Sequence, residues 1–312
     1  MVVQSSRKVE TVLLSVSATT TMSLSFATSP TIVKYNVNWG DDVKTTHSNS
    51  STANKTYSTP FTGDIRITSS TGNPSLFTNF ISNSNNFNFN ISSLLRFRGI
   101  TSLTLGGSNT VSGNIQDFRL GLTNINITGS NVLTGDVVDF KLGLTSLRIV
   151  GSNTISGTVS GLRVINNIEI GGNNTISGNL SGIQLGQNLF NIGGQNTISG
   201  DLVDFKTGLT QLRITGNNTI TGNLVDFKSG LSVLDISGQN TITGNLVDFK
   251  TGLVILTIQG NNTISGDLVD FKTGISQLTI GGQNTISGNI VDFKSGLNII
   301  HIQGQNTIGG NI

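Results

Sequence analysis

Apolar and polar residues follow two different patterns along the chain. In the first 80 residues they alternate one by one within short runs, TVLLSVSA, TMSLSFA, TIVKYNVNW and GDIRITSS. Successive side chains of a β-strand point to opposite faces, so this alternation predicts strands with one buried face. From about residue 100 onward a longer pattern returns every 22 residues, which predicts a repeat structure.

One asparagine marks each repeat, at a spacing of 22 residues with a single spacing of 21. A glycine stands two residues before it and another four after it. Aliphatic residues follow at two and six positions, as Ile220 and Leu224 follow Asn218. The ten positions are Asn109, Asn131, Asn153, Asn174, Asn196, Asn218, Asn240, Asn262, Asn284 and Asn306. We therefore predict a solenoid of ten turns.

No single turn could bury its own apolar residues. Stacked turns bury them against each other, with strands roughly 4.8 Å apart. We expect each asparagine to stack its amide on the next one and to satisfy backbone groups at a corner. A phenylalanine nine residues after the asparagine adds an interior column in seven turns: Phe118, Phe140, Phe205, Phe227, Phe249, Phe271 and Phe293.

The order L-x-x-L-x-I-x-G-x-N-x-I-x-G, over about residues 100–312, resembles the leucine-rich repeat. The phenylalanine column is similar to the phenylalanine spine of that family, although the asparagine falls one residue later than in its commonest form. The repeat holds no helix-forming stretch, so we expect the convex side to be extended or 3₁₀-like. A right-handed parallel β-helix is the alternative. Turns with one strand rather than three would distinguish the two folds.

The segments YNVNWGDD (35–42) and NKTYSTPFTGDIRI (54–67) resemble the polycystic-kidney-disease-type (PKD-type) β-sandwich. Asp42 stands where that family usually has glycine. The resemblance implies an all-β chain with a sandwich at 1–80, an Asn-rich cap at 81–99 and a leucine-rich-repeat-like solenoid at 100–312. It also implies a spacer or adhesion role for the sandwich. The matching residues are Trp39, Gly40, Asp41, Tyr57, Pro60 and Gly63.

Composition narrows the choice of partners. Charged residues make up 11% of the 312 residues and the net charge is +2, which gives a nucleic-acid partner little electrostatic support. The chain has no cysteine, which excludes disulfides and thiolate metal sites. It contains no run of about 18 apolar residues, so we expect no membrane-spanning helix. The N-terminal residues lack a signal-peptide core, so we expect a virion or an extracellular location reached without the Sec route.

Candidate chemistry is sparse. His47 and His301 have no base, nucleophile or metal-ligand pattern around them, so we expect no catalytic residue, no cofactor and no metal. The repeated D-F-K contains a column of aspartates that could bind calcium. Each aspartate is followed two residues later by a base, however, and we favour ion pairs. The pairs begin with Asp117 and Arg119, Asp139 and Lys141, Asp204 and Lys206, Asp226 and Lys228, and continue with Asp248 and Lys250, Asp270 and Lys272, and Asp292 and Lys294.

The turns differ most between the last leucine and the isoleucine of L-x-x-L-x-I, and two residues earlier. These positions face outward from the predicted sheet. Two interpretations stay open: drift on an unconstrained surface, or a recognition surface for a protein or a glycan. The candidate residues are Arg148, Glu169, Asn191, Arg213, Asp235, Val233, Ile255, Thr257, Ile299 and His301.

The tenth turn stops at Ile312 before its V-D-F-K. We expect another subunit to cover Ile308 and Ile312, as a homo-oligomer or a virion would allow. The sequence therefore favours a non-enzymatic structural and recognition protein, a component of a phage virion surface or fibre. A bacterial surface adhesin or extracellular filament subunit is the alternative. A β-helical polysaccharide-degrading enzyme comes third.

Overall fold

The computed structural model describes residues 12–310 except 29–33, 49–50, 72–76, 83–87, 97, 108–109, 119–120, 141–142, 163–164, 184–186, 205–207, 227–229, 249–251, 271–274, 290 and 292–297. The chain forms two compact units, Met1–Thr154 and Ile155–Ile312. Within the described ranges the elements are strands and short 3₁₀ helices, so the prediction of an all-β chain is confirmed. None of their helices is long and apolar enough to cross a membrane.

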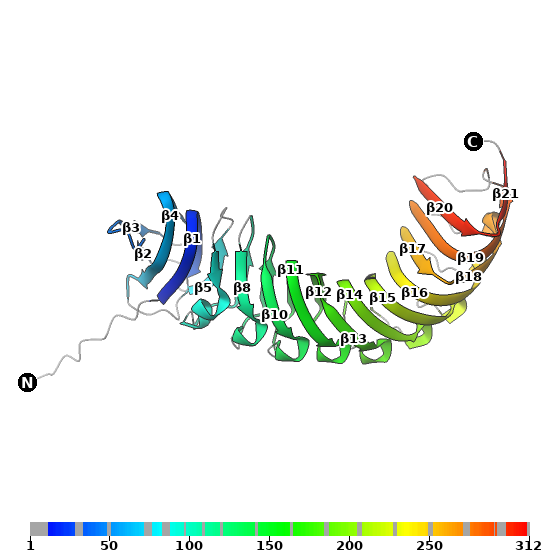
Figure 1. Cartoon of the computed structure of the whole chain (residues 1–312), viewed down its shortest axis with the longest axis horizontal. Helices are drawn as coiled ribbons and strands as arrows, with labels where there is room; N and C mark the ends of the chain where they lie inside the picture. Colours follow the sequence, from blue (N-terminus) through cyan, green and yellow to red (C-terminus); the bar gives the residue numbers. More distant parts are fainter. Residues whose placement is uncertain are drawn as a thin grey trace, which may run out of the picture. The chain divides into compact units, whose positions relative to one another are not determined.

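The first unit begins with antiparallel strands, drawn in blue in Figure 1. They are β1 (Val12–Thr28), β2 (Tyr35–Asn38), β3 (Lys44–His47) and β4 (Thr52–Ser69). β4 pairs with β1 on one side and with β2 on the other, and β2 also pairs with β3. β1 shifts its register against β4 near Thr19, so this long pair contains a bulge.

The core of these strands is aromatic. The Trp39 indole N–H donates to Thr45 Oγ1 at 2.9 Å, and the Tyr57 hydroxyl donates to the Trp39 carbonyl at 2.8 Å. Phe26 stacks on Phe80 with ring centroids 4.9 Å apart. Two residues of the PKD-type pattern, Trp39 and Tyr57, therefore meet in the structure. Membership of that family, and the sandwich at 1–80, stay predictions.

β1 also lies on the edge of the repeat structure. It pairs antiparallel with β5 (Phe77–Ser82) and, at Val16 and Phe89, with β6 (Asn88–Asn90). On their other sides β5 and β6 pair in parallel with β7 (Ser102–Leu105) and β8 (Thr110–Asn114). β1 thus covers strand edges that would otherwise be open to pairing with other chains. The cap predicted at 81–99 contains β6 and η2 (Ile91–Arg96), and its boundaries stay a prediction.

The first unit continues with two parallel ladders, β5–β7–β9–β11 and β6–β8–β10. A 3₁₀ helix follows each second-ladder strand. The remaining elements are η3 (Ile115–Asp117), β9 (Asn124–Ile127), β10 (Val132–Asp136), η4 (Val137–Asp139) and β11 (Ser146–Thr158), which contains the boundary between the units.

The second unit repeats the same turn, and Figure 1 shows its strands following one another in chain order. Its elements are η5 (Val159–Gly161), β12 (Asn167–Gly172), β13 (Thr175–Asn179), η6 (Leu180–Gly182), β14 (Leu189–Asp201), η7 (Leu202–Asp204), β15 (Gln211–Asn223), η8 (Leu224–Asp226), β16 (Val233–Asn245), η9 (Leu246–Asp248), β17 (Ile255–Gly260), β18 (Thr263–Asp267), η10 (Leu268–Asp270), β19 (Gln277–Asn289), β20 (Ile299–Gly304) and β21 (Thr307–Gly309).

Each turn contributes to two ladders with different registers. In the first ladder, residues 22 apart lie side by side, as Leu212 lies beside Leu234. In the second ladder, residues 20 apart lie side by side, as Thr221 lies beside Thr241. The second ladder therefore slides by two residues at every turn. A turn has two strand segments and a 3₁₀ helix, rather than the single strand or the three strands that would separate the two candidate folds.

The repeated asparagine lies at the bend between the two segments. Asn240 is fully buried; its Oδ1 accepts from the Ile220 backbone N–H at 3.0 Å, and its Nδ2 donates to the Gln259 carbonyl at 2.8 Å. The bonds therefore run to backbone groups of the turns before and after. Seven other corner asparagines are also fully buried, whereas Asn306 is half-buried and Asn109 lies outside the described residues: Asn131, Asn153, Asn174, Asn196, Asn218, Asn262 and Asn284.

Aliphatic residues fill the interior. Leu224, Leu234 and Ile236 are each fully buried, and the same positions are buried in most turns. Phe118 and Phe140 are buried in the first unit, whereas the other five members of the predicted phenylalanine column lie outside the described residues. The expectation of extended or 3₁₀ structure in place of helices is confirmed by the 3₁₀ helices from η3 to η10.

Candidate functional site

The first ladder brings the variable positions of successive turns into one row. Leu212 and Ile214 are buried, so Arg213 between them points outward and is partly exposed. Because the register is constant, its equivalents lie on neighbouring strands about 4.8 Å apart. In the second unit the row is Glu169, Asn191, Arg213, Asp235, Thr257, Thr279 and His301. Arg148 lies in the first unit, beside Asn126.

A second row lies two residues earlier, and its side chains differ in exposure. Ile299 is 50% exposed and Ile255 is half-buried. Val233, in contrast, is only 8% exposed, so the expectation that it presents an exposed aliphatic group is wrong. Val233 lies between Gln211 and Ile255 on the neighbouring strands, and these longer side chains cover the shorter valine. We call both rows, within residues 167–301, the outer face.

A pair of opposite charges lies in the middle of the outer face. Arg213 on β15 is the direct neighbour of Asp235 on β16. Burial raises the pKa of the Asp235 carboxyl, and the attraction of Arg213 lowers it; burial prevails. A carboxylate that has lost part of its hydration is stabilised by a further donor or cation. Asp235 is therefore the residue of this face best suited to hold a ligand group.

The structure gives the aspartates of the D-F-K repeat a local role. Asp204 Oδ2 accepts from the Asp201 backbone N–H at 3.3 Å, and Asp248 Oδ2 accepts from the Asn245 backbone N–H at 3.2 Å. These bonds close the start of the 3₁₀ helix. The bases of the expected ion pairs, and Asp292, lie outside the described residues, so the ion pairs stay a prediction.

The last turn shows only part of the predicted assembly surface. Ile308 is half-buried in β21, and Ile312 lies outside the described residues. In the same turn His301 is exposed, and its Nε2 lies 3.1 Å from the Gln303 side-chain nitrogen. Coverage of this end by another subunit stays a prediction.

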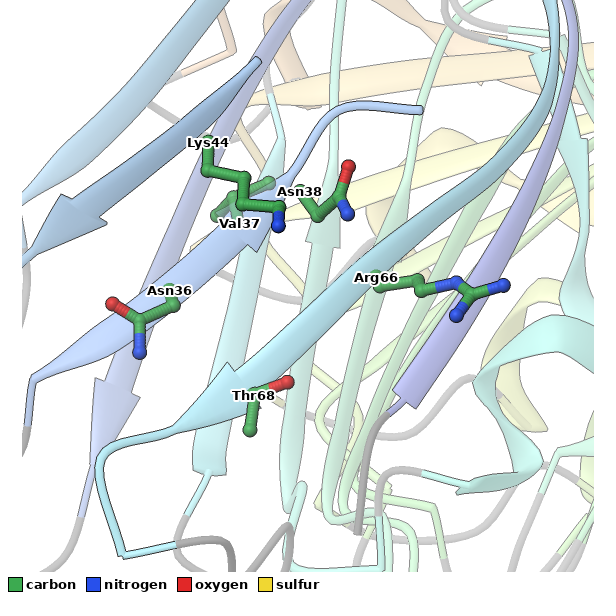
Figure 2. Close-up of a pocket in the computed structure, with 6 residues that line it drawn as sticks. All are labelled: Asn36, Val37, Asn38, Lys44, Arg66 and Thr68. Atoms are coloured by element: carbon green, nitrogen blue, oxygen red, sulfur yellow. The ribbon is translucent and has the colours of Figure 1, made fainter. Parts of the chain in front are cut away.

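Sequence reasoning missed a shallow depression of about 270 Å³ on the antiparallel strands (Figure 2). Lys44 and Arg66 face Asn38 from the two strands beside it, on β3 and β4. Neither cation pairs with a carboxylate in the part of the chain that the structure describes, where the ion pair is Lys55 with Asp41. The depression suits a small anion. Both cations are well exposed, so water screens their charges. No period or motif in the sequence marks it.

Comparison with known proteins gives a single structural likeness to report. Protein-family models give no match to the chain, and neither do curated protein sequences. Among solved structures, the plant peptide hormone receptor RGFR1 in complex with RGF2 is similar with a TM-score of 0.49 and 18% sequence identity. The likeness covers 70% of this chain, which spans 41% of the receptor chain.

Proposed function

We propose that this chain is a non-enzymatic recognition protein that binds an extended segment of another protein on the outer face. The observation that carries the proposal is the half-buried Asp235 carboxylate beside Arg213, in a row where side chains differ from turn to turn. Buried positions repeat almost unchanged, so the solenoid acts as a scaffold for this row.

The chemistry of the outer face fits a peptide better than a charged polymer. Leu189 and Ile255 provide aliphatic surface two residues before the charged positions. Asp235 would hold an ammonium or guanidinium group and Arg213 a carboxylate, each as a charge-assisted hydrogen bond. Partly desolvated charges flanked by aliphatic groups give both specificity and affinity.

A binding screen tests this proposal. The full chain is applied to an array of extracellular peptides and glycans, and hits are measured by calorimetry. Asp235→Asn and Arg213→Gln should each weaken binding at least about tenfold, the cost of one charge-assisted hydrogen bond. Gln239→Ala, on a different side of the same turns, should leave binding unchanged. A hit confined to glycans, or one insensitive to both changes, would contradict a peptide site.

We further propose that the recognition takes place on a virion surface, with the chain as a phage surface or fibre component. Low charge, internal duplication and an all-β fold support this setting. Immunogold labelling of purified particles tests it. Labelling of bacterial envelopes instead would favour the surface adhesin or the filament subunit.

A further inference from the structure

The second ladder carries an uncharged, regularly repeated surface of its own. Each turn of the second unit reads Asn or Gln, then Thr, then Ser or Thr at alternate positions, as in Asn217, Thr219 and Thr221. Asn218 and Ile220 between them are buried, so the alternate side chains point outward. We call the hydroxyl residues the hydroxyl face: Thr175, Ser177, Thr197, Ser199, Thr219, Thr221, Thr241, Thr243, Thr263, Ser265, Thr285, Ser287 and Thr307.

Constant register turns these residues into a lattice. The second hydroxyl residue of one turn lies beside the threonine of the next, from Ser177 beside Thr197 to Ser287 beside Thr307. The intervening turns repeat this pairing, as at Thr221 beside Thr241. Neighbours are about 4.8 Å apart across strands and about 6.7 Å apart along them.

The two columns of hydroxyls differ in their bonds. In the second column each hydroxyl donates to a glycine carbonyl of the preceding turn; Thr221 reaches the Gly200 carbonyl at 3.3 Å and Thr243 the Gly222 carbonyl at 3.3 Å. Ser177, Ser199, Ser265 and Ser287 make the equivalent bond.

The threonines of the first column are all exposed, and their hydroxyls have no hydrogen bond to any other described residue. Threonine is stiff at χ1, so its methyl and hydroxyl groups hold fixed positions. The first column therefore offers unused hydroxyls at regular intervals, next to a column whose hydroxyls are already held in place.

The ligand has to match an uncharged lattice. The three outward columns carry no Lys, Arg, Asp, Glu or aromatic residue, so they lack the anchors of a protein interface. Carboxylates enter only at the border, where Asp201 accepts from Thr221 at 3.2 Å and Asp267 accepts from Ser287 at 3.1 Å. Water ordered by the methyl groups and bonded to the free hydroxyls would extend over the whole face.

We propose that the hydroxyl face binds the surface of an ice crystal. Ice is itself a lattice of hydroxyl donors and acceptors, with repeats similar to the spacings of this face, so the bound water rows join the crystal. The protein then adsorbs to the ice and slows its growth. This function belongs to a different ladder segment from the outer face and does not rest on the proposed peptide recognition.

Ice uptake of the fluorescently labelled full chain tests the proposal. Ice is grown slowly on a cold finger, and the labelled fraction in the ice is compared with that of an unrelated carrier protein. Thermal hysteresis is measured in parallel. We expect uptake above the carrier level and measurable hysteresis. The double variant Thr219→Lys with Thr241→Lys should lose both, because two charged chains break the lattice.

The matched control is Thr257→Lys with Thr279→Lys, which adds the same charges on the outer face. It should keep wild-type ice uptake. Circular dichroism checks that each variant is folded; if the lysine variant unfolds, Thr219→Gln with Thr241→Gln replaces it. Exclusion of the wild-type protein from ice, equal loss in both double variants, or retention on crystalline cellulose without ice uptake would each overturn the proposal.

Discussion

The Oδ1 atom of Asn240 accepts a hydrogen bond from the backbone N–H of Ile220, in the turn before it, at 3.0 Å. Its Nδ2 binds the Gln259 carbonyl in the turn after it. Asn240→Ala would leave both buried backbone groups unpaired, so we expect the free energy of unfolding to fall by about 2–4 kcal/mol. Urea denaturation measures the change. Gln239→Ala, an exposed neighbour, should cost little; equal losses would mean that the corner bonds are unimportant.

The glycine before each corner is required for two separable reasons. Gly238 has a φ of 141°, and a Cβ there would lie 2.6 Å from the Asn218 backbone nitrogen. Gly252 has a φ of 104°, but a Cβ there would meet nothing within 4 Å. Gly252→Ala should therefore show backbone strain alone, about 1–2 kcal/mol. Gly238→Ala should cost clearly more in thermal unfolding, because the adjacent turn has to move as well.

The stability of the second unit should depend on pH through Asp235. Burial raises its folded pKa above the ordinary value of 3.8. The protonated acid therefore contributes stability below pH 3.8, and this contribution is lost as the pH rises through the folded pKa. Asp235→Asn should remove that loss.

Arg213→Gln should enlarge the same loss, because Arg213 lowers the Asp235 pKa. Urea unfolding of wild type and both variants across this pH range measures the effect. Parallel pH profiles for all three would show that Asp235 does not titrate in this window.

The Tyr57 hydroxyl should stabilise the first unit through its bond to the Trp39 carbonyl. Tyr57→Phe removes the bond but keeps the ring that stacks on Phe61 at 4.7 Å. We expect a loss of about 1 kcal/mol in the free energy of unfolding. Thr56→Val, at the exposed neighbouring position, serves as the control. Unchanged stability in Tyr57→Phe would mean that water replaces the lost bond.

The period, the all-β class and the buried columns could be read from the sequence, because each turn repeats the same requirement. A residue such as Leu234 meets identical neighbours above and below, and its burial follows from the pattern. The bonds of Asn240 could be read only in part. The sequence indicates a corner amide, but amide-to-amide stacking and amide-to-backbone bonding predict the same recurrence.

Features that depend on the path between turns could not be predicted. The two-residue slide that brings Thr221 beside Thr241 arises where the chain bends, and the 22-residue period is the same with or without it. The burial of Val233 depends on its longer neighbours Gln211 and Ile255. Lys44 and Arg66 are brought together by strand pairing across a stretch that has no repeat.

The corner asparagines make the turns interchangeable. Asn218 and Asn240 bind main-chain atoms on either side, which every amino acid supplies, so any copy can follow any other without loss of these bonds. Duplicating a whole copy of 22 residues in the gene would lengthen the rod and preserve its seams. A duplication of any other length would leave one asparagine out of step. The molecule is thus free to evolve in length by whole units while its cross-section stays fixed.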